Sequence, residues 1–217
     1  MSLIPVFKIG LWNAWIFMLY SILALFILPL LFNKERFKAK EPYSKTEKKY
    51  WSIWVIIYFL TILYSFFVPL QLGTIWFYIG LPICLLGLIL YTIVSLNFVT
   101  TPFDELVTKG LYRYSRHPIY LSLFLFFTGV SIASASWIFI LFTVITMILC
   151  RIFSISEEEF CLERYGDSYR RYMIRTPRWI GIPKSGENWS VWKSRKRSSN
   201  ICNWGCIYNR YNWNLHS

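Results

Sequence analysis

Long apolar runs with almost no charge inside them constrain this chain more than any other feature. The first run covers 11–32 and, as a helix, is long enough to cross a hydrocarbon core of about 30 Å. Further runs follow at intervals, separated by short polar segments. We therefore expect an all-α, polytopic membrane protein.

Five membrane spans are predicted. They cover residues 11–32, 51–68, 75–96, 118–130 and 137–153. The last two form a helical hairpin whose turn falls in the small residues of 131–136. Both arms are short for a bilayer, so we expect them to be tilted or to use their flanks. Gly80, Pro82 and Gly87 in the third span suit either a kink or close helix packing.

Basic residues are concentrated between the spans and predict the orientation of the chain. Lys and Arg number 23, against 11 Asp and Glu, which gives a net charge of +12. The positive-inside rule places 34–49, 97–117 and everything after 154 in the cytoplasm. The N-terminus is then outside and the C-terminus is cytosolic. We assign the excess charge to these loops and to membrane lipid headgroups, and expect no nucleic-acid partner.

The composition limits where any chemistry can occur. Only 16% of the 217 residues are charged and 56% are hydrophobic, whereas a soluble domain is usually nearer one-quarter charged. One membrane domain leaves little room for a separate soluble catalytic domain. A reaction would therefore be carried out by loops and helix ends at the membrane face.

The cysteines do not indicate a metal site. Cys84, Cys150 and Cys161 lie in or beside apolar runs, where thiols normally behave as small hydrophobic groups. Cys202 and Cys206 form a single pair without a second pair to complete a zinc site. We expect no metal.

A cationic strip at 110–120 lies between two apolar runs and reads Gly-Leu-Tyr-Arg-Tyr-Ser-Arg-His-Pro-Ile-Tyr. Gly110 permits an unusual backbone angle or the close approach of a ligand. Pro118 suits the first turn of a helix. His117 would then precede that helix, next to free N–H groups that favour an anionic or polar ligand.

An acidic strip, Ser-Glu-Glu-Glu at 156–159, follows the last span. We expect it on a cytosolic extension of the last helix, which breaks at Gly166 and resumes up to Pro177. Taken alone, the cationic strip suits a basic anchor beside the membrane, and the acidic strip suits a solvated helix face. Together, on both sides of one hairpin, they indicate a polar pocket that faces the cytosol.

The two strips resemble a known family. Three motifs are similar to those of the isoprenylcysteine carboxyl methyltransferase and phospholipid methyltransferase group of integral membrane enzymes. They are Leu-Val-x-x-Gly-x-Tyr-x-x-x-Arg-His-Pro-x-Tyr, the glutamate pair followed by Tyr-Gly-x-x-Tyr-x-x-Tyr, and a closing Thr-Pro-Arg-Trp at 176–179. The likeness covers 101–183, expected to be the methyltransferase core. Residues 1–100 resemble the family only in having three hydrophobic spans. Residues 184–217 form a tail that does not resemble the family and is basic and rich in Trp and Asn.

The resemblance implies that S-adenosylmethionine binds in a cytosol-facing pocket near the C-terminus and that a lipidic acceptor enters from the bilayer. It implies a pocket lined by Leu106, Val107, Gly110, Tyr112, His117, Pro118, Tyr120, Glu157 and Glu158. It further implies that the residues linked to activity are Arg116, Arg151 and Glu158.

The chemistry depends on the acceptor. A carboxylate is already anionic at neutral pH and needs a cation to position it, for which Arg116 is the first candidate and Arg151 the second. An amine acceptor must lose a proton, which would make His117 or a glutamate the base. We favour the carboxylate of an isoprenylcysteine-like acceptor, although the residues do not decide between the two.

Two other functions fit a membrane protein of this kind. A nicotinamide-dependent sterol-type reductase has a similar C-terminal portion but usually needs more spans than five. A transporter subunit or lipid-binding scaffold would not be an enzyme, and transporters tend to have internal repeats that this sequence lacks. No Gly-x-Gly-x-x-Gly follows a strand, which excludes a soluble Rossmann methyltransferase.

Overall fold

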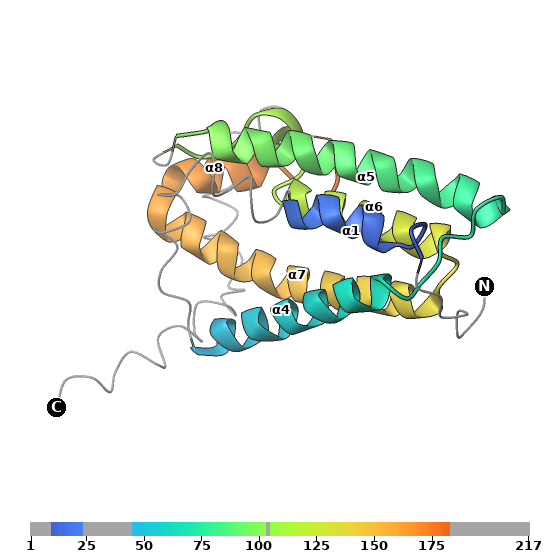
Figure 1. Ribbon diagram of the computed structural model, residues 1–217. Coiled ribbons are helices and arrows are strands. Elements are labelled where there is room, and N and C mark those ends of the chain that lie inside the picture. The colour runs from blue at the N-terminus through green and yellow to red at the C-terminus, as the bar shows by residue number, and fades with distance from the viewer. Residues whose placement is uncertain (1–9, 24–44, 103–104, 183–217) are drawn as a thin grey trace. The chain divides into compact units, whose positions relative to one another are not determined.

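The computed structural model describes residues 10–23, 45–102 and 105–182, all of which belong to one compact unit, 1–183. These residues form helices and no strand, so the all-α prediction is confirmed for them (Figure 1). The elements are α1 Trp15–Ile22, α4 Lys45–Ser65, α5 Ile75–Thr100, the 3-10 helix η2 Gly110–Arg113, α6 Pro118–Ala133, α7 Trp137–Tyr165 and α8 Asp167–Arg175. The predicted tail at 184–217 lies outside the described residues.

Two helices, α5 and α7, are long and apolar enough to cross a membrane. Helix α6 is equally apolar but has 16 residues, in line with the short hairpin arm expected there. Helix α4 contains most of the predicted span 51–68 but begins with a basic turn. The predicted span 11–32 continues past residue 23, beyond the residues described there. The number of five spans therefore stays a prediction.

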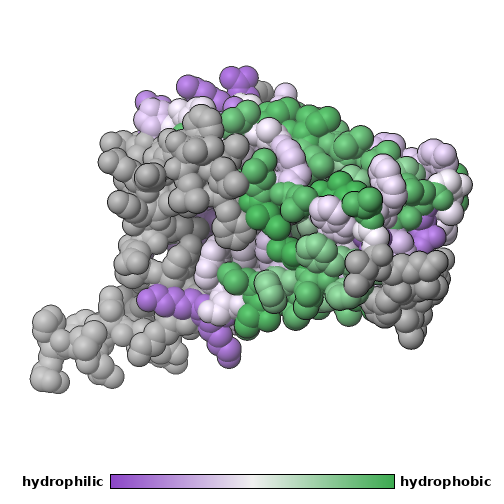
Figure 2. All heavy atoms as spheres, viewed as in Figure 1, coloured by the Kyte–Doolittle hydropathy of each residue, from purple (hydrophilic) through white to green (hydrophobic). Residues whose placement is uncertain are grey.

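The outer faces of the long helices are apolar. Figure 2 shows hydrophobic side chains across the middle of the molecule. Large exposed side chains include Ile56, Phe59, Leu63, Ile79, Leu86, Ile89, Leu141, Val144 and Ile148. A soluble protein rarely leaves so large an apolar surface in water, whereas lipid tails solvate it without cost. The chain is therefore a membrane protein.

Charged residues in the described part of the chain lie at one end of the helices. They fall within 45–49, 105–117 and 151–178, where α4 and α6 begin and where α5 and α7 finish. The opposite helix ends, at 66–74 and 134–136, carry none. We call the first of these the charged end of the helices; it is where both polar strips of the sequence lie.

Helices α5 and α6 pack with their backbones in contact. A Cβ atom on Gly129 of α6 would lie 2.2 Å from the backbone nitrogen of Cys84 on α5. A Cβ on Gly87 of α5 would lie 2.4 Å from the backbone nitrogen of Phe126. The close packing expected at Gly80 and Gly87 is confirmed, and it fixes where α6 begins relative to α5.

The helix ends differ from expectation in two places. Helix α5 continues to Thr100, four residues beyond the predicted end, because the polar side chains there bond to the carbonyls of the preceding turn. Helix α6 continues to Ala133, which shortens the hairpin turn to 134–136. Ser136 then caps α7 by accepting a hydrogen bond from the Phe139 N–H.

Candidate functional site

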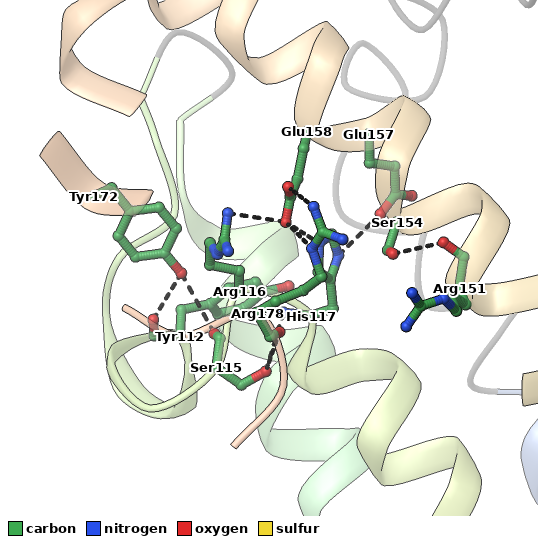
Figure 3. Close-up of polar contacts among 10 residues, drawn as sticks. All are labelled: Tyr112, Ser115, Arg116, His117, Arg151, Ser154, Glu157, Glu158, Tyr172 and Arg178. Carbon is green, nitrogen blue, oxygen red and sulfur yellow. Dashed lines mark hydrogen bonds and ion pairs between the residues drawn. The ribbon is translucent and has the colours of Figure 1, made fainter. Parts of the chain in front are cut away.

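Three segments meet at the charged end of the helices (Figure 3): the loop 105–117 before α6, the last turns of α7, and 176–182 after α8. The loop bends at Gly110, which has a φ of +60°, as the sequence led us to expect. A Cβ atom there would lie 2.3 Å from Asn97 Nδ2 on α5. Glycine alone lets the loop pass this close to α5 in this conformation.

The loop delivers two cationic side chains immediately before α6. His117 is the N-cap residue of that helix and Pro118 lies in its first turn, which confirms the predicted helix start. The His117 N–H donates a hydrogen bond to Ser115 Oγ at 3.1 Å. Arg116 N–H donates to the carbonyl of Pro177 at 3.0 Å, which ties the loop to the segment after α8.

Glu158, on the part of α7 beyond its apolar stretch, is the centre of the cluster. Its carboxylate is buried and contacts three cationic side chains. Oε1 lies 3.1 Å from His117 Nε2, 3.0 Å from Arg116 Nη1 and 3.0 Å from Arg178 Nε. Oε2 accepts a hydrogen bond from Arg178 Nη2 at 2.6 Å. Burial alone would raise the pKa of Glu158, but its bonds to His117 and Arg178 and the charge of Arg116 lower it to about 2.

The ring of His117 lies between two carboxylates. Nε2 faces Glu158, and Nδ1 lies 3.5 Å from Glu157 Oε2. Burial alone would lower the pKa of His117, but hydrogen bonds and charge from the two glutamates raise it above its ordinary value. An imidazole with an acceptor at each nitrogen is best satisfied when both nitrogens carry a proton. This environment makes His117 a donor.

The side chain of Arg116 has hydrogen-bond donors without a partner among the described residues. Its side chain is 11% exposed, and Nη1 lies 3.0 Å from Glu158 Oε1 in an ion pair. Nε and Nη1 have no hydrogen-bond partner among the described residues. Buried donors in native proteins nearly always have a partner, so Nε is a position where water or an acceptor group of a ligand would bond.

Aromatic rings lie beside the charged groups. The ring of Tyr120 stacks on His117, with 5.7 Å between centroids and 10° between planes. Trp179, from the segment after α8, lies 6.2 Å from His117 at a tilt. The cluster thus combines charged groups with flat apolar surfaces.

The segment after α8 contributes groups that the sequence analysis missed. Arg178 and Trp179 belong to the closing Thr-Pro-Arg-Trp, to which no role was given. Gly181 N–H bonds to the carbonyl of Tyr114 at 3.2 Å, and the Tyr172 hydroxyl donates to the carbonyl of Tyr112 at 2.7 Å. These contacts hold the segment against the loop and bring Arg178 to Glu158.

Other predicted site residues lie around the cluster without joining it. Arg151 is exposed, and its side chain has no ion pair with a described residue (Figure 3). Val107 and Tyr112 are buried in a small apolar cluster with Val94, beneath the loop. Pro118 is buried and Leu106 is half-buried. The buried side chains of Val107 and Tyr112 support the backbone of the loop. The predicted catalytic role of Arg151 stays a prediction.

In the described part of the chain, no three His, Cys, Asp or Glu side chains are grouped as metal ligands. Cys84 and Cys150 are free and buried, as expected for thiols acting as small hydrophobic groups. Cys161 is half-buried. Cys202 and Cys206 lie outside the described residues.

Comparison with known proteins agrees with the motifs. Residues 75–168 match the family model of the phospholipid methyltransferases. A protein-S-isoprenylcysteine O-methyltransferase from Schizosaccharomyces pombe is 33% identical over 81 residues, which cover 36% of this chain and 33% of that protein. The alignment thus spans about a third of the relative. These findings confirm the resemblance seen in the two strips.

Proposed function

Because residues 75–168 are related to the phospholipid methyltransferases, we propose that this chain is an integral membrane methyltransferase that uses S-adenosylmethionine. Its acceptor is a lipid or a lipid-like molecule, with the carboxylate of an isoprenylcysteine-like compound favoured. The observation that carries the proposal is the cluster of Arg116, His117 and Arg178 around Glu158.

The residues present fit the cofactor. S-adenosylmethionine has an aromatic base, a ribose diol, a cationic sulfur and an amino-acid group. The rings of Tyr120 and Trp179 suit the base, and Glu157, 32% exposed at its side chain, offers a carboxylate to hydroxyls or to a positive charge. Gly110 permits close approach of a ligand to the loop backbone. When bound, the cofactor supplies a methyl group on a positively charged sulfur.

The charges of the cluster favour an anionic acceptor. His117 has its proton stabilised by two glutamates, so it is poorly suited to remove one from an amine. Glu158 is held ionised and is fully engaged by three cationic groups, so it is not a free base either. A carboxylate needs no base. The protonation of His117 and Glu158 therefore favours a carboxylate over the amine that the sequence left open.

Arg116 is the residue we assign to the acceptor. Its Nε and Nη1 are buried donors without a hydrogen-bond partner among the described residues. The Nε–H can donate a charge-assisted hydrogen bond to one oxygen of the acceptor carboxylate, and the guanidinium charge attracts that group. Holding the attacking oxygen in line with the methyl group is the main task in this displacement. The ion pair with Glu158 holds the guanidinium of Arg116 in position.

We assign the charged end of the helices to the cytosol. Lys and Arg prevail among the charges there, and cytoplasmic loops of membrane proteins carry such an excess. The N-terminus would then lie outside and the C-terminus in the cytosol. Under this orientation the cluster opens toward the soluble cofactor, while a lipidic acceptor has access from the bilayer beside it.

The cofactor is tested by calorimetric titration of S-adenosylmethionine into the folded, monodisperse protein. We expect binding, and we expect His117→Ala, Glu158→Ala and Glu157→Gln each to weaken it. Glu159→Gln is the matched control, because Glu159 carries the same charge in the next position but is exposed. Unchanged affinity in the three variants would remove these residues from the site.

The same samples separate the alternative functions. A nicotinamide-dependent reductase would bind NADPH and not S-adenosylmethionine. A scaffold or transport protein would bind neither. Either result, on protein that remains folded and monodisperse, would contradict the proposed methyltransferase.

A further inference from the structure

Arg178 makes the most complete polar contact in the cluster, although it lies outside the family match, which ends at residue 168. Its Nε and Nη2 bond to the two oxygens of Glu158 at 3.0 and 2.6 Å. This is the parallel, two-bond geometry in which guanidinium and carboxylate fix each other's orientation. Arg178 is 34% exposed at its side chain, whereas Glu158 is 4% exposed.

The backbone around Arg178 is fixed from both sides. On one side the carbonyl of Pro177 accepts the N–H of Arg116, and on the other Gly181 N–H bonds to the carbonyl of Tyr114. Between them, Ser115 Oγ donates to the carbonyl of Arg178 itself at 3.2 Å. The register of Arg178 against the loop before α6 is therefore set independently of its side chain.

The orientation of Glu158 determines which N–H donors of Arg116 remain available to a ligand. Arg178 provides the hydrogen bond to Oε2, while Oε1 is shared by His117, Arg116 and Arg178. Without Arg178, Oε2 of Glu158 loses its hydrogen-bond donor, and Arg116 is the cation that replaces it while Oε1 keeps its contact with His117. Arg116 would then turn its Nε–H toward Glu158 and no longer offer it to the acceptor.

We propose that Arg178 is a positioning residue, which holds Glu158 in the orientation that leaves the Nε–H of Arg116 for the carboxylate of the acceptor. This inference rests on the proposed function. It also explains why a contact made from beyond α8 reaches into the centre of the site. Arg178 acts through Glu158 and does not itself meet the acceptor.

The first test is kinetic, on the full chain with a prenylated cysteine as the acceptor. Loss of one hydrogen bond to a charged group corresponds to about a tenfold effect or more. We therefore expect Arg178→Gln to raise the KM for the acceptor about tenfold, with a much smaller change in cofactor affinity. Arg178→Lys should recover part of the loss. The matched control is Arg175→Gln, which removes an exposed positive charge on α8.

The second test does not need activity. The charged groups around His117 are Arg116 of its own loop, Glu157 and Glu158 of α7, and Arg178. In Arg178→Gln, Glu158 has one cation fewer and binds the proton of His117 more strongly, so the NMR titration midpoint of His117 should rise. A variant that merely loosens the site would lower this midpoint toward the ordinary value.

The outcomes separate the inference from the proposed function. An unchanged acceptor KM in Arg178→Gln would overturn the positioning role, as would an unchanged or lowered His117 midpoint. If no acceptor is methylated by the wild-type protein, the proposed function fails. The direction of the His117 shift would still decide whether Arg178 controls the charge environment of Glu158.

Discussion

His117 has a carboxylate beside each of its ring nitrogens, and this pairing governs its protonation. We predict an NMR titration midpoint above the ordinary histidine value of about 6.5. The chain contains two histidines, so the variant His216→Gln assigns the signals. Glu157→Gln should lower the midpoint of His117. A wild-type midpoint at or below the ordinary value would contradict the arrangement of the two glutamates.

The raised pKa of His117 has a defined effect on stability. Its contribution is fully present at pH values below the ordinary histidine pKa and is lost as the pH rises through the raised value. Glu158 acts in the opposite sense. Its pKa is lowered to about 2, so its contribution is present above the ordinary glutamate value and is lost as the pH falls toward 2.

At the residue scale, the sequence indicated most members of the cluster but not the contacts among them. Arg116, His117, Glu157 and Glu158 stood out because their charges flank an apolar hairpin. The sequence could not reveal that Glu158 contacts three cationic side chains, because Arg178 reaches it only after α8 folds back over the loop. The family resemblance also made Arg151 a candidate, yet it is exposed beside the cluster.

At the element scale, the contact between α5 and α6 depends on Gly129. We predict that Gly129→Ala lowers the stability of the protein by about 1–3 kcal/mol, since the new methyl group would meet the backbone of Cys84. Thermal unfolding in detergent measures the change. The control is Gly10→Ala, where a Cβ meets only the Asn13 side chain at an ordinary 3.5 Å. Equal melting temperatures for the two variants would contradict the close packing.

The sequence predicted helix positions better than helix ends. Apolar runs located α5, α6 and α7, and Gly166, with a φ of +51°, ended α7 as expected. Both α5 and α6 end a few residues beyond the predicted spans, where hydroxyl side chains bond to carbonyls of the preceding turn. The pattern of apolar residues in the sequence does not reveal such bonds. The pairing of loop 105–117 with segment 176–182 was equally hidden, since most of its bonds join backbone groups.

For the whole molecule, the one-sided distribution of charge predicts the orientation in the membrane. In a variant without native cysteines, a cysteine replacing Lys49 or Lys109 should react with an impermeant maleimide only from the cytosolic side. A cysteine replacing Gln71, at the uncharged helix ends, should react only from outside. Labelling of positions 49 and 109 from opposite sides would contradict the helix arrangement, and labelling of both from outside would reverse the orientation.

The central claim is that the cluster around Glu158 serves methyl transfer to a carboxylate. The most direct measurement supplies the protein, in membranes or detergent, with S-adenosylmethionine labelled on its methyl group and with a prenylated cysteine. We predict a labelled lipid product that releases labelled methanol in base, as a methyl ester does, and its loss in Arg116→Ala. A base-stable labelled product on an amine lipid, or no transfer to either acceptor, would contradict the account.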